Sequence, residues 1–175
     1  MNRSHGFTLV ELMITLLLAA IIMSLAVPGF GDLMRGNRAA TQANELVAAL
    51  NLARSEAVKR GARVSACPST NQATCANSTD WATGWIVFVD LAANDGAAPV
   101  VQDPVLRAWG ALAGGGDFEG PTWVRYRPLG DVDGTSLPPP PARTFEHRVS
   151  GCRHDQGRDI FINAAGQVRV VRVDC

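Results

Sequence analysis

One acidic side chain lies inside the long apolar run near the start of the chain. Residues 7–27 read FTLVELMITLLLAAIIMSLAV, and Glu11 is the one charged residue among them. As a helix they would extend for about 31 Å, close to the hydrocarbon thickness of a bilayer. A carboxylate in such a segment costs on the order of 2.5–3.5 kcal/mol, so acids there usually have a partner and a function.

The segment around this acid resembles the type IV prepilin motif, since residues 6–12 read GFTLVEL. The resemblance implies that residues 1–6 are a leader, which a prepilin peptidase removes by cutting after Gly6. It also implies that the same enzyme methylates the new N-terminal Phe7, and that Glu11 recruits the subunit into a filament.

Cleavage would leave a free amino group on Phe7, four residues before Glu11 on the same side of the helix. The offset along the helix axis is about 6 Å. A carboxylate and an ammonium group with this offset can neutralise each other between neighbouring helices, which would fix their register.

Orientation follows from the leader, MNRSHG, which contains Arg3. A positive residue before a first span favours keeping that side in the cytoplasm. We therefore expect a single pass of the inner membrane at residues 7–27, a cytoplasmic N-terminus and a periplasmic C-terminal domain.

Two other interpretations of the N-terminus stay open. Ser24-Leu25-Ala26 fits the small-x-small pattern of a secretory signal-peptidase site, although the acid in the apolar region and the short charged region argue against it. A plain, uncut membrane anchor explains the length of the run but leaves Glu11 without a partner.

The cysteines form a second group with possible chemistry: Cys67, Cys75, Cys152 and Cys175. None forms a C-x-x-C pair, and no histidine stands at zinc-finger spacing from them. An even number outside the cytoplasm favours disulfides, with three connectivities open. We prefer Cys67–Cys75, which would close a short polar loop, and Cys152–Cys175, which would pin the chain end to the body. Free buried thiols are the alternative.

The sequence offers little for catalysis or for a cofactor. It contains no G-x-S-x-G elbow and no P-loop. Asp131-Val132-Asp133-Gly134 begins like a calcium loop, but Ala142 stands at the twelfth position, so the EF-hand pattern fails. We expect neither an enzyme nor a bound metal or cofactor.

The elements that position these residues begin with a long helix. Pro28 and Gly29 follow the apolar run and should kink or soften it. Gly61 is a natural stop. We expect a helix over residues 8–60, in which residues 28–61 form an amphipathic continuation. Its apolar stripe is Leu33, Ala43, Leu46, Val47, Leu50, Ala53, Ala57 and Val58.

From residue 62 to residue 175 the apolar period changes to two. This predicts an antiparallel sheet domain packed against the long helix, an α+β arrangement. The resemblance to prepilins implies that this fold is pilin-like. The expected strands are residues 63–67, 85–90, 105–109, 122–127, 144–149, 159–163 and 167–173.

The body resembles the FimT/GspH group of minor pilins and pseudopilins, through ANEL (43–46), LARSEAVKRG (52–61), CP (67–68) and GWIVFVD (84–90). The resemblance implies a low-abundance subunit of a type IV pilus or of a type II secretion pseudopilus. Its partners would be prepilin peptidase, other pilins or pseudopilins and an inner-membrane assembly platform. The resemblance does not separate the two machines.

DNA binding for natural transformation is the alternative function. Charge is balanced overall, with 16 Lys+Arg and 16 Asp+Glu, but arginines are concentrated in the C-terminal third. Residues 166–169 (GQVR) resemble the Gly-Arg-x-Arg tail of DNA-uptake pilins, with glutamine in place of the first arginine. Arg153, Arg158, Arg169 and Arg172 could contact phosphates, although Arg172 should point to the opposite face from Arg169. A solvated strand edge is the alternative there.

Overall fold

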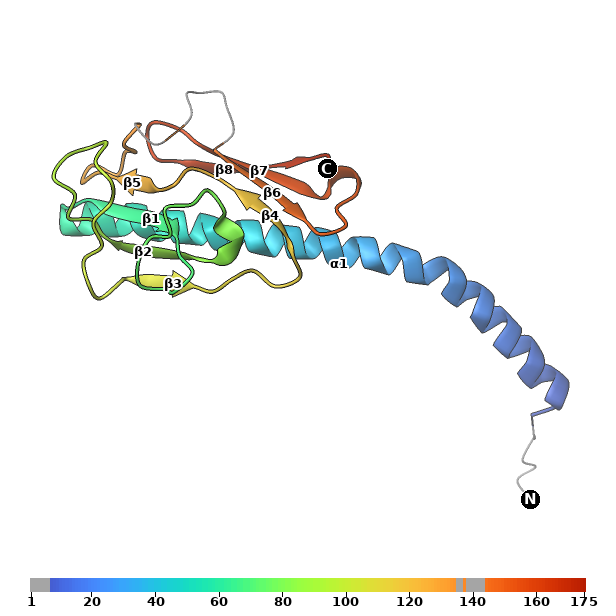
Figure 1. Ribbon diagram of the computed structural model, residues 1–175. Helices are drawn as coiled ribbons and strands as arrows, with labels where there is room; N and C mark the ends of the chain where they lie inside the picture. Colours follow the sequence, from blue (N-terminus) through green and yellow to red (C-terminus); the bar gives the residue numbers. More distant parts are fainter. Residues whose placement is uncertain (1–6, 135–136, 138–143) are drawn as a thin grey trace, which may run out of the picture. The chain divides into compact units, whose positions relative to one another are not determined.

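The computed structural model describes residues 7–134, 137 and 144–175, with the backbone alone for residues 25–29. One long helix and two antiparallel sheets give the expected α+β class (Figure 1). The chain forms two compact units, Met1–Met34 and Arg35–Cys175, which are considered separately.

Helix α1 runs from Leu9 to Arg60. It is continuous at Pro28 and Gly29, whose side chains lie outside the described residues, so the expected kink stays a prediction. Within the described part of the chain, no helix has the combination of length and apolarity needed to cross a membrane. The leader, including Gly6, also lies outside the described residues.

In the second unit, α1 buries a narrow stripe of small and apolar residues spaced alternately four and three apart. Its members are Ala39, Ala43, Leu46, Leu50, Ala53 and Ala57, and the neighbouring Ala49 is also fully buried. Two residues of the expected stripe are instead exposed, Leu33 by 57% and Val58 by 54%. Val58 lies one residue, or about 100° of rotation, beyond the buried Ala57, and Leu33 belongs to the first unit.

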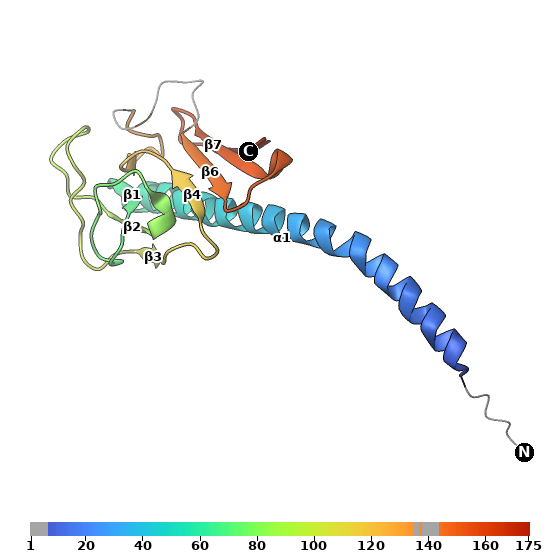
Figure 2. The same ribbon diagram turned by 45° about the vertical axis from the view of Figure 1, so that its right-hand side comes forward.

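Within the described residues, eight strands follow the helix and form two four-stranded sheets, in the orders β3-β2-β1-β5 and β4-β6-β7-β8. The labelled strands lie alongside the part of α1 that belongs to the second unit (Figures 1 and 2). The first sheet contains β1 (Val64–Pro68), β2 (Trp85–Val89), β3 (Arg107–Trp109) and β5 (Val124–Tyr126). The second contains β4 (Gly116–Glu119), β6 (Phe145–Val149), β7 (Gly157–Ile162) and β8 (Val168–Val173). Short 3₁₀ helices, η1 (Trp81–Thr83) and η2 (His154–Gln156), lie between strands.

The sequence interpretation was wrong in two details of the sheets. It gave a single sheet, whereas the strands divide into two, because strand pairing across long loops leaves no local pattern. It also missed β4, since the glycines before this short strand have the appearance of a turn.

The main core lies between α1 and both sheets. The helix stripe packs with β1, β2 and β5 on one side and with Phe118, Phe145 and Ile160 of the other sheet. Trp81 stands edge-on to Phe145, with ring centroids 5.0 Å apart. Strand β1 is buried throughout, because a second cluster covers its other face.

Both preferred disulfides are present. Cys67, at the end of β1, is bonded to Cys75 in the following loop, with Cα atoms 5.6 Å apart. Cys152 is bonded to Cys175, which ties the end of the chain to the segment between β6 and η2. The described cysteines include no free thiol.

A fully buried arginine holds the loop after β2 in place. Arg125 lies 2.7 Å from a carboxylate oxygen of Asp90 and 3.4 Å from one of Asp133, and it donates to the backbone oxygen of Ala97. Ser65 donates to the same Asp90 carboxylate. Because the charges are paired and the carboxylates accept further hydrogen bonds, this group can stay inside the domain.

We expect Arg125→Met to lower the free energy of unfolding by about 3–5 kcal/mol, because it leaves Asp90 and Asp133 buried without their counter-charge. Urea unfolding of the detergent-solubilised protein, followed by tryptophan fluorescence, measures this. The matched control is Arg127→Met, whose 42% exposed side chain should contribute less than about 1 kcal/mol. Equal losses in the two variants would contradict the structural role of the buried pair.

Candidate functional site

The N-terminus of α1 is closed by two reciprocal hydrogen bonds between Thr8 and Glu11. The Thr8 hydroxyl accepts from the Glu11 N–H at 3.2 Å, and the Glu11 carboxylate accepts from the Thr8 N–H at 3.5 Å. Thr8 directly precedes Leu9, the first helical residue, so this pair is a capping box. The sequence signal for it is Thr-x-x-Glu at residues 8–11.

The capping box gives Glu11 a position suited to a second charged partner. Its carboxylate is exposed and lies in the first turn of α1, where the helix dipole favours negative charge. A carboxylate accepts several hydrogen bonds through its two oxygens. Glu11 can therefore keep the bond from Thr8 and accept one from an ammonium group of another chain.

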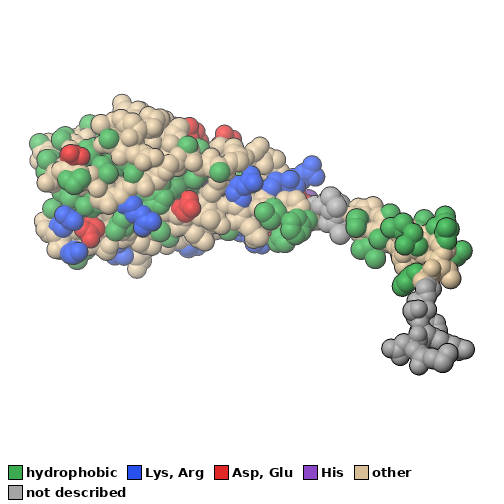
Figure 3. Space-filling view, turned by 90° about the horizontal axis from the view of Figure 1, so that it is seen from below, with side chains coloured by type: hydrophobic (Ala, Val, Ile, Leu, Met, Phe, Trp, Pro, Cys, Tyr) green, Lys and Arg blue, Asp and Glu red, His purple; other side chains and the backbone are tan. Residues whose placement is uncertain are grey.

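Large apolar side chains surround this acid along the first unit, and they are exposed in the isolated chain (Figure 3). They are Phe7, Leu9, Val10, Leu12, Met13, Ile14, Leu16, Leu17, Leu18, Ile21, Ile22, Met23, Phe30, Leu33 and Met34. Exposed apolar surface of this extent marks contact with lipid or with another protein. The first unit is thus an interaction surface.

The four C-terminal arginines are not gathered into one free basic surface. Arg158 is buried and donates to the backbone oxygens of Asp155 and Gly157, and burial lowers the pKa of its guanidinium group. Arg172 pairs with the Asp155 carboxylate at 3.2 Å. Two of the four candidates for phosphate binding are therefore already engaged.

The other two candidates are exposed but lie apart along the chain. Arg169 stands over the ring of Phe161, with 5.1 Å between the guanidinium carbon and the ring centroid, and Arg153 precedes η2. In the register of β7 and β8, Arg169 faces Phe161 and Arg172 faces Arg158. Positions three apart in a strand point to opposite faces, as expected.

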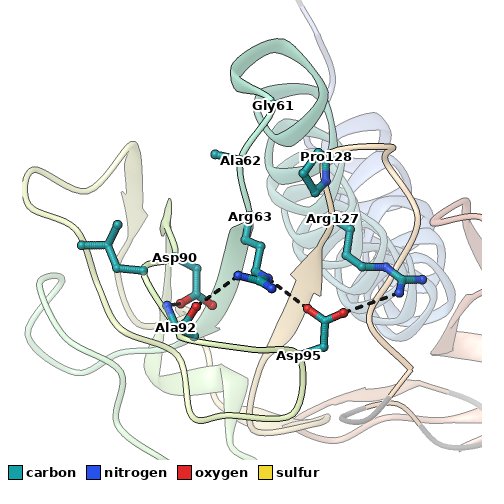
Figure 4. Close-up of a pocket in the computed structure, with 9 residues that line it drawn as sticks. Gly61, Ala62, Arg63, Asp90, Ala92, Asp95, Arg127 and Pro128 are labelled. Atoms are coloured by element: carbon teal, nitrogen blue, oxygen red, sulfur yellow. Dashed lines mark hydrogen bonds and ion pairs between the residues drawn. The ribbon is translucent and has the colours of Figure 1, made fainter.

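A pocket of about 490 Å³ lies at the C-terminal end of α1 (Figure 4). At its centre Asp95 is shared by Arg63, at 2.9 Å, and Arg127, at 3.5 Å. Arg127 also pairs with Asp131, which raises the pKa of its guanidinium group. The charges in this pocket satisfy one another. Nowhere in the described residues do three or more His, Cys, Asp or Glu side chains form a group that could hold a metal ion.

An N-terminal helix with an exposed apolar first part, whose second part packs under an antiparallel β domain, defines a pilin-like filament subunit. A family model described as the type II transport protein GspH matches residues 42–166, and the prokaryotic N-terminal methylation motif matches residues 1–27. The chain belongs to the GspH family. It is a minor pilin or pseudopilin subunit, and its methylation motif implies a membrane-anchored component.

Two crystal structures of the type IV minor pilin FimU from Pseudomonas aeruginosa strain PAO1 are similar to this chain. The one in space group P65 is 25% identical, with a TM-score of 0.50, over 75% of this chain and 90% of FimU. The one in space group P21 is 24% identical, with a TM-score of 0.53, over 77% and 89%, and shows the fold alone. A search of curated protein sequences finds no match.

Proteins of this class are structural subunits rather than enzymes.

We expect Thr8→Val to destabilise the first turn of α1 by about 1 kcal/mol, because the hydroxyl that caps Glu11 is lost. Thr8→Ser keeps the hydroxyl and should behave as the natural protein. Amide hydrogen exchange of residues 9–12, measured by NMR in lipid nanodiscs, should become roughly fivefold faster in the first variant alone. Unchanged exchange in Thr8→Val would show that the capping box contributes nothing.

Proposed function

We propose that this chain is a minor subunit of a type IV pilus, processed after Gly6, methylated at Phe7 and assembled through Glu11. The observation that carries the proposal is the Glu11 carboxylate, held in a capping box within an exposed apolar helix. Such a helix needs a partner for its surface, and such an acid needs a partner for its charge.

The free amino group of a neighbouring subunit's Phe7 fits the second requirement. It would stand four residues before Glu11 of its own chain, so two parallel helices offset by about 6 Å would bring amine and carboxylate together. In apolar surroundings an ion pair is much stronger than in water. Only the paired register neutralises both groups, so this contact would select one arrangement of the bundled helices.

Processing and topology follow the same chemistry. A prepilin peptidase would expose the Phe7 amine, and the apolar segment at residues 7–27 would hold the subunit in the inner membrane until assembly. The β domain would then lie in the periplasm, where disulfides persist, in agreement with Cys67–Cys75 and Cys152–Cys175. Other pilins and an inner-membrane assembly platform are the partners we infer.

The choice of a pilus over a secretion pseudopilus rests on the 25% identity to FimU, in a match that covers 90% of the FimU chain. The family model is named after a type II transport protein, so the pseudopilus is the competing assignment. Deletion in the source organism should abolish pilus-dependent twitching and leave export of secreted enzymes intact. The opposite pattern would assign the subunit to the secretion machine.

Glu11→Gln separates the two roles of the acid. Glutamine can still close the capping box, but it cannot neutralise an ammonium group. We expect normal removal of the leader and at least a tenfold loss of the subunit from sheared filaments, measured by immunoblot against the membrane fraction. Glu11→Ala should lose incorporation as well.

Glu45→Gln is the matched control, because Glu45 is an exposed acid on the same helix in the second unit. It should leave both processing and incorporation unchanged. Normal incorporation of Glu11→Gln would rule out the charge-pairing mechanism, while failure of processing would move the role of Glu11 to the peptidase.

A further inference from the structure

A buried chain of hydrogen-bonding groups connects α1 to the second sheet. His147 on β6 is 1% exposed, and its Nδ1 lies 3.0 Å from the backbone oxygen of Asp117 on β4. Its Nε2 lies 3.0 Å from Oε1 of Gln42 on α1, which is 6% exposed. The amide nitrogen of Gln42 in turn donates to the backbone oxygen of Ala113, also at 3.0 Å.

The three contacts of this chain need three hydrogens, and a neutral ring does not provide enough. Neutral imidazole carries one N–H, and the amide of Gln42 carries hydrogens on its nitrogen alone. If Nδ1 donates to Asp117, the bare Nε2 faces the Gln42 oxygen. Exchanging the oxygen and nitrogen of the Gln42 amide would supply a hydrogen to Nε2, but it would place the amide oxygen next to the backbone oxygen of Ala113. One contact of the three therefore lacks a hydrogen in either orientation.

An imidazolium ring removes the deficit, because both of its nitrogens donate. We propose that His147 is a proton-sensitive joint, in which uptake of one proton completes the chain tying α1 to β4, β6 and the segment 110–115. The ring of Phe118 stacks on the imidazole, with its centroid 4.4 Å from that of His147.

The charged groups around the ring act in both directions. On the sheet side, Arg148 on β6 and Arg158 on β7 disfavour a positive charge on the His147 ring, while Asp117 on β4 favours it. Glu146 is the other charged neighbour on β6, on the opposite face of the strand from His147. The segment 110–115 reads GALAGG and contributes no charge.

On the helix side, a pocket of about 480 Å³ lies next to Gln42. Its wall includes Gln42 itself, with Arg38 and Glu45 from α1 and Trp109 from β3. Gln42 thus lines the pocket and also contacts Nε2 of His147.

Burial disfavours the charged ring more strongly than its hydrogen-bond acceptors favour it, so the pKa of His147 lies below its ordinary value. The unfolded chain therefore takes up the proton first, at about pH 6.5, and the folded chain at lower pH. It follows that the contribution of His147 to stability is fully present above about pH 7, decreases as the pH falls through 6.5, and levels off once the folded ring is charged. The joint completes its hydrogen bonds in this same acid range.

The test is an NMR titration of the full chain in lipid nanodiscs with ¹⁵N-labelled histidine, from pH 8 to pH 4, with His147→Gln used to assign the signal. At pH 8 we expect one protonated and one bare ring nitrogen, and at low pH two N–H groups that exchange slowly with water. Gln42→Met removes the acceptor at Nε2 and should lower the proton affinity of His147 at least threefold. Gln42→Glu places a carboxylate there and should raise the affinity at least tenfold.

Glu45→Gln is the control, because it removes a charge from the same pocket without touching the ring, and it should change the affinity less than twofold. Two results would overturn the proposal. One is the same proton affinity for His147 in the natural chain, Gln42→Met and Gln42→Glu. The other is a ring that stays neutral to pH 4 while the domain remains folded.

Discussion

The packing of α1 against both sheets is the contact on which the rest of the second unit depends. Among the described residues no strand pairing joins the two sheets, and the core that they share includes the helix residues from Ala43 to Ala57. Alanine at four of the six positions of the helix stripe lets strands approach the helix backbone closely, while Leu46 and Leu50 fill the space between. The aromatic residues of η1, β2, β4 and β6 then meet above the helix and close the core.

Features that depend on local sequence were predictable, whereas those that depend on contacts between distant residues were not. The helix stop at Gly61 and most strands are set by local pattern, so they could be predicted. Gly61 adopts a φ of +60°, and the N–H of Ala62 returns to the oxygen of Ala57, an arrangement that glycine permits. The division into two sheets and the strand β4 could not be predicted, because they depend on pairing between residues far apart in the chain.

Buried polar groups were the least predictable part. Arg125 is one of the arginines concentrated in the C-terminal third, yet it is fully buried and fixes the loop after β2. The buried hydrogen-bonding role of His147 is likewise visible only in the structure, where α1 places Gln42 beside β6. The alternation of buried and outward positions in β6 does put residue 147 inside, but no local rule supplies its partners. Arg158 is one of the arginines proposed to bind DNA, and the sequence alone does not show that its side chain is buried.

The N-terminal site shows the reverse, since its residues are a prediction from the sequence, while the geometry of the cap that Thr8 and Glu11 form is seen only in the structure. The local cap of Thr8 on Glu11 is worth only about 1 kcal/mol, whereas a carboxylate left in hydrocarbon costs roughly 2.5–3.5 kcal/mol. One backbone hydrogen bond therefore orients the acid but does not offset its burial. An ammonium group on a neighbouring helix could make up the difference, and it can do so without breaking the cap, because the carboxylate has further acceptor positions. Under the proposed function, a subunit built in this way would hold its acid ready before assembly and would gain the missing stabilisation only within a filament.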